Sequence, residues 1–153
     1  MPAGSRLSVR RSVLDPSADL VAVDLAMPSD VAEVEQAVEL MARHCFEGTP
    51  PSDRTAFRLR VTLAEALSNA ILRGNLEDPG KSVWVRAEVS RTMIRLSVRD
   101  EGCGCEPGRR ACPSLPSDLE DDGGRGLFII TQLADQVEFN DEGNTIWMTL
   151  PRC

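Results

Sequence analysis

The sequence contains no long apolar run. No stretch approaches the roughly 20 consecutive apolar residues that a membrane-spanning helix needs. The opening residues, MPAGSRLSVRRSVLD, lack the apolar centre of a secretory signal peptide. We therefore expect a cytoplasmic protein without a membrane partner. Its five cysteines are expected to be thiols, because the cytoplasm is a reducing compartment.

Several common functional motifs are also missing. His44 is the only histidine, so a histidine-based catalytic triad has little support. The P-loop pattern GxxxxGK[ST] does not occur, and Pro107 stands where a dinucleotide-binding fingerprint needs its third glycine. The cysteines between positions 103 and 112 do not have the paired spacing of a zinc site. These absences disfavour the commonest triad, zinc and dinucleotide classes.

Positive charge is scarce. The 153 residues carry a net charge of −7, which disfavours a nucleic-acid partner held by phosphate contacts. A nucleotide remains compatible with this charge, because helix N-termini and glycine-lined turns bind phosphate without net basic charge. The length fits one domain with a proper core.

The segment 54–73, RTAFRLRVTLAEALSNAILR, predicts a central helix that is apolar over most of its circumference, including Phe57 and Leu72. One polar stripe runs along it at spacings of three or four residues. A carboxylate and a carboxamide one turn apart on a buried helix need polar partners. A cleft with a ligand and an ion would supply them, but the helix taken alone favours a surface stripe or an N-terminal helix end. The stripe consists of Arg58, Thr62, Glu65, Asn69 and Arg73.

The remaining pattern predicts an α/β two-layer sandwich (α+β), with a mixed, mostly antiparallel sheet and helices on one face. We expect a flexible N-terminal segment, 1–19, and a single domain over 20–153. The expected elements are a strand over 19–26, a helix over 30–46 capped by Ser29, hairpin strands over 83–89 and 94–98, a helix from 127, and final strands over 137–140 and 145–150.

Two glycine motifs follow the first hairpin. Asp100-x-Gly102-x-Gly104 stands at a strand end, where an aspartate can accept a hydrogen bond from an exocyclic amine such as that of adenine. Gly124-x-Gly126 precedes an apolar helix, whose N-terminus favours phosphate. Taken singly, the first could be an ordinary turn and the second a flexible connector.

The order of these features resembles the GHKL (Bergerat-fold) ATPases, and most closely the stand-alone anti-sigma-factor serine/threonine kinases of the SpoIIAB and RsbW type. The likeness covers roughly residues 20–151. It is carried by three boxes, which are EALSNAI over 65–71, DEGCG over 100–104 and GGRGLFI over 123–129.

The resemblance implies roles for individual residues. Glu65 would be the catalytic base, Asn69 would bind Mg²⁺, and Asp100 would recognise the adenine of ATP. A loop over about 105–123 would form an ATP lid. The remaining nucleotide-binding positions would be Arg73, Gly102, Gly104, Gly124, Arg125, Gly126, Leu127 and Thr145, of which Thr145 would support the adenine-binding aspartate through water.

By the same resemblance the protein would be a kinase that binds a sigma factor and phosphorylates an anti-anti-sigma protein of the STAS type. Arg73 stands where related kinases carry a histidine, and the lid is acidic around 117–122. These departures leave open a nucleotide-gated binding module with little or no turnover. An unrelated α/β domain with three coincidental motifs is the third alternative, and the sequence leaves homodimerisation open.

Overall fold

A computed structural model of the chain describes residues 6–102 and 122–152, with the backbone alone for 122–124. The strands are β1 (Ser8–Asp15), β2 (Leu20–Pro28), β3 (Ser82–Val89), β4 (Met93–Arg99), β5 (Gln136–Phe139) and β6 (Thr145–Pro151). The helices are α1 (Val34–Cys45), α2 (Asp53–Asn69) and α4 (Asp122–Leu133). Short helical turns are η1 (Pro16–Ala18), η2 (Val31–Glu33) and η3 (Ala70–Gly74), of which η3 is a π-helix.

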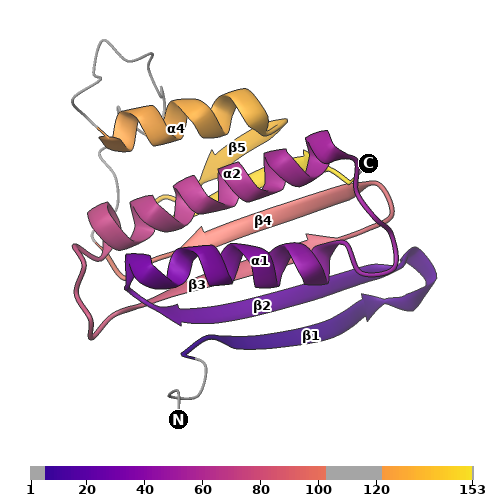
Figure 1. Ribbon diagram of the computed structural model, residues 1–153, viewed down its shortest axis with the longest axis horizontal. Coiled ribbons are helices and arrows are strands. Elements are labelled where there is room, and N and C mark those ends of the chain that lie inside the picture. Colours follow the sequence, from indigo (N-terminus) through magenta and orange to yellow (C-terminus); the bar gives the residue numbers. More distant parts are fainter. Residues whose placement is uncertain (1–5, 103–121, 153) are drawn as a thin grey trace.

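The strands form one six-stranded sheet in the order β1-β2-β3-β4-β6-β5. The helices α1, α2 and α4 lie side by side over one face of this sheet (Figure 1). This arrangement confirms the predicted two-layer sandwich. Every pairing between the described strands is antiparallel, so the sheet has no mixed part in these residues.

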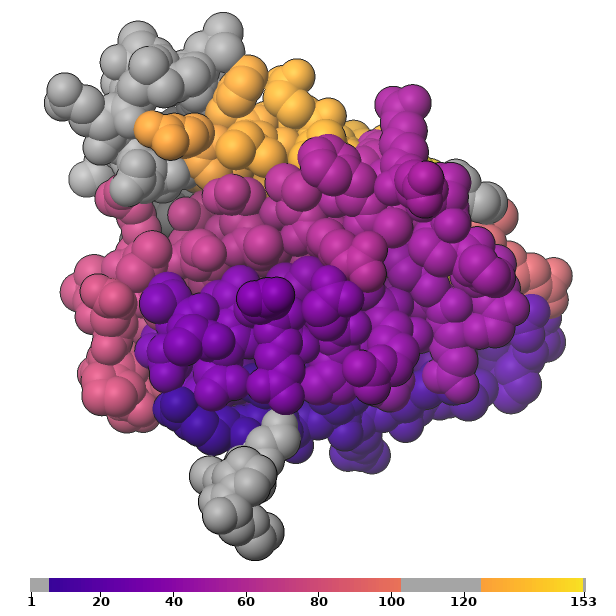
Figure 2. Space-filling model, viewed as in Figure 1, coloured from indigo at the N-terminus to yellow at the C-terminus, as the bar shows by residue number. Residues whose placement is uncertain are grey.

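The core lies between the sheet and the helices. Residues of β3 alternate between buried and half-buried along its whole length, and the buried set faces the helices. Helices α1 and α2 close over this layer as a continuous surface in the space-filling view (Figure 2). Among the described residues, no helix combines the length and the apolar character required to cross a membrane. Fully buried side chains include Leu25, Met41, Leu63, Leu67, Leu96 and Met148.

The segment 1–19, expected to be flexible, contains a strand, and that prediction was wrong for Ser8–Asp15. The strand β1 pairs with β2 from Ser8 opposite Ala26 to Asp15 opposite Leu20. It is an edge strand, and most of its side chains are exposed. Backbone pairing rather than burial of side chains therefore stabilises it, which explains why its sequence shows no apolar period.

The start of the first helix also differs from the prediction. Asp30, not Ser29, is the cap, because its side chain accepts a hydrogen bond of 3.0 Å from the Ala32 N–H. Ser29 is buried, and its backbone N–H donates to the Lys81 carbonyl oxygen instead. The first turn is the 3-10 turn η2, and its Val31 side chain is exposed.

The central helix begins where the sequence places it. The Ser52 side chain accepts a hydrogen bond of 3.1 Å from the Thr55 N–H. After Asn69 the α-helix changes into the π-helical turn η3, a rare geometry that often occurs at functional sites. The expected burial of the apolar residues in this segment was wrong for Phe57 in α2 and for Leu72 in η3, because both are exposed.

The helix after the second glycine motif starts earlier than expected. Gly124 and Gly126 lie inside α4 rather than before it. The predicted lid, 105–123, falls outside the described residues except for positions 122 and 123, which are helical. The hairpin of β5 and β6 follows as predicted.

Two substitutions on α2 test its orientation. Leu63→Ala removes a fully buried side chain, so it should lower the free energy of unfolding by about 2–5 kcal/mol. Phe57→Ala is the matched control on the same helix, and it should cost under about 1 kcal/mol because Phe57 is 57% exposed. Urea unfolding measures both values, and equal losses would contradict this packing.

Candidate functional site

The polar stripe of α2 faces α4. At one end of the stripe, the Arg58 Nε donates to the Leu133 carbonyl oxygen at 2.6 Å, and its Nη2 lies 2.9 Å from the Asp135 Oδ1. Arg58 therefore caps the C-terminus of α4, where a cation is favoured. The Thr62 hydroxyl donates to the Arg58 carbonyl oxygen at 2.7 Å. These two stripe residues are thus satisfied within the protein.

The other end of the stripe carries Glu65 and Asn69. A Cβ placed on Gly126 would lie 3.0 Å from the Glu65 Oε2 and 3.1 Å from the Asn69 Nδ2. The first turns of α4 therefore lie directly against both side chains, which only a glycine permits without displacing them. Within residues 6–102 and 122–152, neither side chain makes a hydrogen bond. A carboxylate and a carboxamide are thus available to a ligand beside Gly126.

Asp100 lies at the end of β4, next to the end of η3. Its Oδ1 accepts a hydrogen bond of 2.7 Å from the Gly102 N–H. A Cβ on Gly74 would overlap the Asp100 carboxyl group, and a Cβ on Gly102 would overlap the Gly74 carbonyl. Burial raises the pKa of Asp100, while the Gly102 N–H and Lys81 lower it in part. Two glycines therefore let a half-buried carboxyl group approach the backbone closely.

Thr145 reaches the same end of the sheet from β6. It lies opposite Arg99 in the pairing of β4 with β6, and it is 7% exposed. The Asp100 N–H donates to the Asn144 carbonyl oxygen at 2.9 Å. The Thr145 N–H in turn donates to the Asn140 Oδ1 at 3.1 Å. The turn before β6 is therefore attached to the strand end that carries Asp100.

The remaining residues predicted to bind the nucleotide differ in exposure and location. Arg73 is exposed in η3, and Arg125 is exposed in α4. The Leu127 side chain is 4% exposed and belongs to the core, so only its backbone could face a ligand. Gly124 lies in α4, and Gly104 is outside the described residues.

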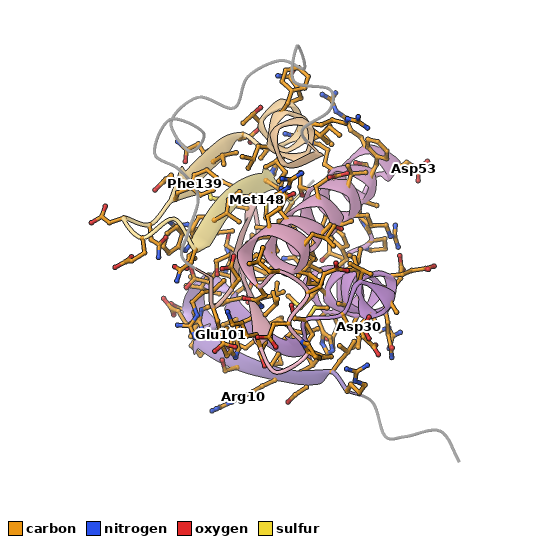
Figure 3. The ribbon with its side chains drawn as sticks, turned by 90° about the vertical axis from the view of Figure 1, so that its left-hand side faces the viewer. Arg10, Asp30, Asp53, Glu101, Phe139 and Met148 are labelled. Atoms are coloured by element: carbon orange, nitrogen blue, oxygen red, sulfur yellow. The ribbon has the colours of Figure 1, made fainter. Side chains whose placement is uncertain are left out.

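The structure brings the predicted residues together in two groups. One is Glu65, Asn69 and Gly126, and the other is Asp100, Gly102 and Thr145. Both lie at the end of the molecule where α2 ends, β3 begins and β4 ends, on the left in Figure 1. The view onto this end shows Glu101, the neighbour of Asp100, below the helices (Figure 3). Each role assigned to these residues remains a prediction.

Gly74 and Asn75 carry no functional signal in the sequence, where they look like an ordinary helix stop. Asn75 is fully buried, and its side chain bonds to two other segments. No periodicity or motif distinguishes such a residue from an asparagine in an exposed turn. Its contacts arise only when β3 and β4 are folded against the helix end.

A separate cleft of about 520 Å³ lies among the β1–β2 hairpin, the end of α1 and the end of β6. It contains none of the predicted site residues. His44 lines this cleft, and its Nδ1 is buried without a hydrogen-bond partner in the described part of the chain. The charged lining residues are Arg11, Asp19, Glu47, Arg91 and Arg152.

The fold and the paired groups at one sheet end define a two-layer α/β domain of the GHKL ATPase class, which confirms the resemblance seen in the sequence. The family model for the histidine kinase-like ATPase domain matches residues 26–150. The chain belongs to this family, and the family implies that it binds ATP.

Several curated proteins that are similar to this chain are named anti-sigma F factors. The chain is 28% identical over 96 residues to an anti-sigma F factor of Halalkalibacterium halodurans, covering 59% of this chain and 65% of that protein. It is 29% identical over 105 residues to an anti-sigma F factor of Bacillus cytotoxicus, covering 65% and 71%. For the anti-sigma F factor of Oceanobacillus iheyensis, the identity is 27% over 127 residues, covering 79% and 86%.

Gly126→Ala tests the approach of α4 to the polar stripe. The added Cβ would displace the ends of Glu65 and Asn69, so Mg-ADP affinity should fall about threefold to tenfold. The fold should keep its stability, because alanine favours a helix more than glycine does. Calorimetric titration and thermal unfolding measure the two effects. Unchanged Mg-ADP affinity would show that nucleotide binding does not depend on the positions of these two side chains.

Asp100→Asn tests the effect of burial on Asp100 through the pH dependence of the free energy of unfolding. As pH rises from the usual aspartate pKa of 3.8 towards the raised pKa, the unfolded chain loses its proton before the folded chain does. The wild-type free energy of unfolding should therefore fall in this window relative to Asp100→Asn, and the difference should be constant above it. Urea unfolding of both proteins at several pH values gives this difference. If the wild-type free energy of unfolding instead rises with pH relative to that of Asp100→Asn, the surroundings stabilise the carboxylate form of Asp100.

Proposed function

We propose that the chain is an ATP-dependent serine/threonine protein kinase that binds a sigma factor and phosphorylates an anti-anti-sigma protein of the STAS type. The observation that carries this proposal is the position of Glu65 beside Asn69 and Gly126. A protein that only bound nucleotide would not need a carboxylate beside the metal-binding position. A kinase does, because the attacking hydroxyl must lose a proton.

The two groups of residues support a consistent orientation of ATP. Asp100 would accept a hydrogen bond from the adenine amine, in a turn whose glycines allow close approach of the base. The phosphates would lie towards Asn69 and the beginning of α4. The backbone N–H groups of the first helical turn and the helix dipole favour negative charge there. Arg73 and Arg125 would add positive charge near the phosphates.

The residues beside Gly126 also fit a magnesium ion. Mg²⁺ prefers oxygen ligands and keeps several waters, so one amide oxygen from Asn69 is a sufficient protein ligand. The space that a Cβ on Gly126 would fill borders the side chains of both Glu65 and Asn69. When bound, the ion would neutralise phosphate charge during transfer.

Glu65 would act on the substrate hydroxyl rather than on the nucleotide. It is one helical turn from Asn69, so a serine or threonine presented beside the phosphates would come within its reach. Its carboxylate makes no hydrogen bond to the described residues and could take the hydroxyl proton. Catalysis would otherwise rest on positioning.

The partners are proposed from the relatives. Several similar proteins are anti-sigma F factors, a name that describes action on a sigma factor. The STAS-type substrate follows from the resemblance to SpoIIAB and RsbW.

A second candidate function is a nucleotide-gated binding module with little or no turnover. Arg73, an exposed residue in η3, favours it because related kinases carry a histidine at this position. A guanidinium could strengthen phosphate contacts without supporting transfer. This candidate would show partner binding that depends on ATP, with no phosphate transferred to the partner.

Glu65→Gln separates the two candidates. A STAS-domain protein recovered by pull-down and identified by mass spectrometry would first be tested as a substrate of the wild-type chain. The variant should bind Mg-ATP within about twofold of wild type. It should transfer phosphate at least about 10²-fold more slowly, because the base is removed. Single-turnover transfer of labelled phosphate measures the rate.

Glu39→Gln is the matched control, since Glu39 is a surface carboxylate on α1 paired with Arg60. It should transfer phosphate at the wild-type rate. Full activity of Glu65→Gln would show that the base lies elsewhere. Absence of transfer by the wild-type chain, with ATP-dependent binding retained, would favour the binding module.

A further inference from the structure

One buried amide joins three segments next to Asp100. Asn75 follows η3 and is 0% exposed. Its Nδ2 donates to the Ser82 carbonyl oxygen at 2.9 Å, at the start of β3. Its Oδ1 accepts a hydrogen bond of 2.7 Å from the Glu101 N–H, just after β4. Both ends of the amide are therefore used by backbone groups of other segments.

Two more hydrogen bonds complete the junction. The Glu101 Oε2 accepts from the Ser82 N–H at 2.6 Å, so the start of β3 and the segment after β4 are also joined directly. The Asn75 N–H donates to the Ala70 carbonyl oxygen at 2.8 Å, which closes the π-helical turn. Hydrogen bonds from a buried amide to several segments rigidify their surroundings. We define Asn75, Ser82 and Glu101 as the amide junction.

The amide junction determines where Asp100 lies. Asp100 precedes Glu101 in the chain, and Gly74 precedes Asn75. The Asp100 carboxyl group packs against Gly74, and Gly102 packs against the Gly74 carbonyl, so that neither glycine has room for a side chain. Asn69 lies on the same continuous helical segment, immediately before η3. The separation between Asn69 and Asp100 therefore depends on how η3 is held against the end of β4.

The backbone after Asn75 is strained. Leu76 and Glu77 have φ angles of 53° and 57°, in the left-handed region that residues other than glycine rarely adopt. Leu76 is 75% exposed, so burial of its side chain does not explain this conformation. Such strain persists only where surrounding contacts impose it. The Asn75 bonds, with the Glu77 N–H donating to the Ile71 carbonyl oxygen at 2.8 Å, are contacts of that kind.

We propose that Asn75 is a positioning residue that holds Asp100 in register with Asn69 and thereby makes the site select adenine. This inference rests on the proposed nucleotide site. Asn75 acts through the Glu101 backbone, and its buried amide has no part in contacting the nucleotide. Loss of the amide should therefore affect recognition of the base more than binding of the phosphates.

Asn75→Ala in the full chain tests this proposal with two nucleotides. Mg-IDP serves as the probe of phosphate binding, because its base carries a carbonyl in place of the adenine amine. Wild type should prefer Mg-ADP over Mg-IDP by at least about tenfold. In Asn75→Ala the ADP affinity should fall at least about fivefold, while the IDP affinity should change by less than about twofold.

Val38→Ala is the matched control for a general loss of stability. Val38 is 5% exposed on α1 and belongs to the core but not to the candidate site. This variant should unfold at a lower temperature and keep the wild-type ratio of ADP to IDP affinity. A purely structural role for Asn75 would make Asn75→Ala behave in the same way.

The outcomes are distinguishable. An unchanged ADP to IDP ratio in Asn75→Ala, with wild type selecting ADP, overturns this inference and leaves the nucleotide site intact. A wild-type chain that fails to bind or select ADP overturns the proposed site and this inference together. If Asn75→Ala does not fold, Asn75→Ser is tested by the same criteria. Amide hydrogen exchange of the unmodified protein gives an independent check, because rapid exchange at the Glu101 N–H would overturn the junction.

Discussion

The packing of α4 on the polar stripe of α2 is the interaction on which the candidate site depends. Arg58 holds the C-terminal end of α4 through the Leu133 carbonyl, and Gly126 brings its other end against Glu65 and Asn69. The two helices are therefore antiparallel, and one polar stripe serves two purposes. One end satisfies a helix terminus, while the other end presents a carboxylate and a carboxamide that make no hydrogen bonds to the described residues.

A second constraint acts at the sheet. The carboxyl group of Asp100 is half-buried, and burial alone would favour its protonated form. Close backbone contacts at Gly74 and Gly102, with the buried amide of Asn75, hold this group where β4 ends. The two constraints meet in the segment from Asn69 to Asn75, where the helix changes from α to π geometry. A nucleotide spanning both groups would therefore have its two ends positioned by one continuous piece of chain.

Elements with a strong side-chain pattern were predictable. The alternation in β3 and β4 and the apolar period of α2 each reflect burial of one face, so the sequence is enough to find them. The edge strand β1 was not predictable, because β2 supplies its hydrogen bonds and most of its own side chains stay exposed. Phe57 in α2 and Leu72 in η3 look like core residues in the sequence, yet both face solvent, because the apolar pattern does not say which side of the helix the sheet covers.

The sequence alone determined the family, because three short motifs stand in the order that the resemblance to this family requires. It also determined the two-layer architecture through hydrophobic periodicity. Only the tertiary structure decided that Gly126 lies against Glu65 and Asn69, that Arg58 caps α4, and that Asn75 joins η3 to β3 and β4. These contacts join residues far apart in the chain or depend on backbone geometry, and local sequence patterns carry no information about such distances.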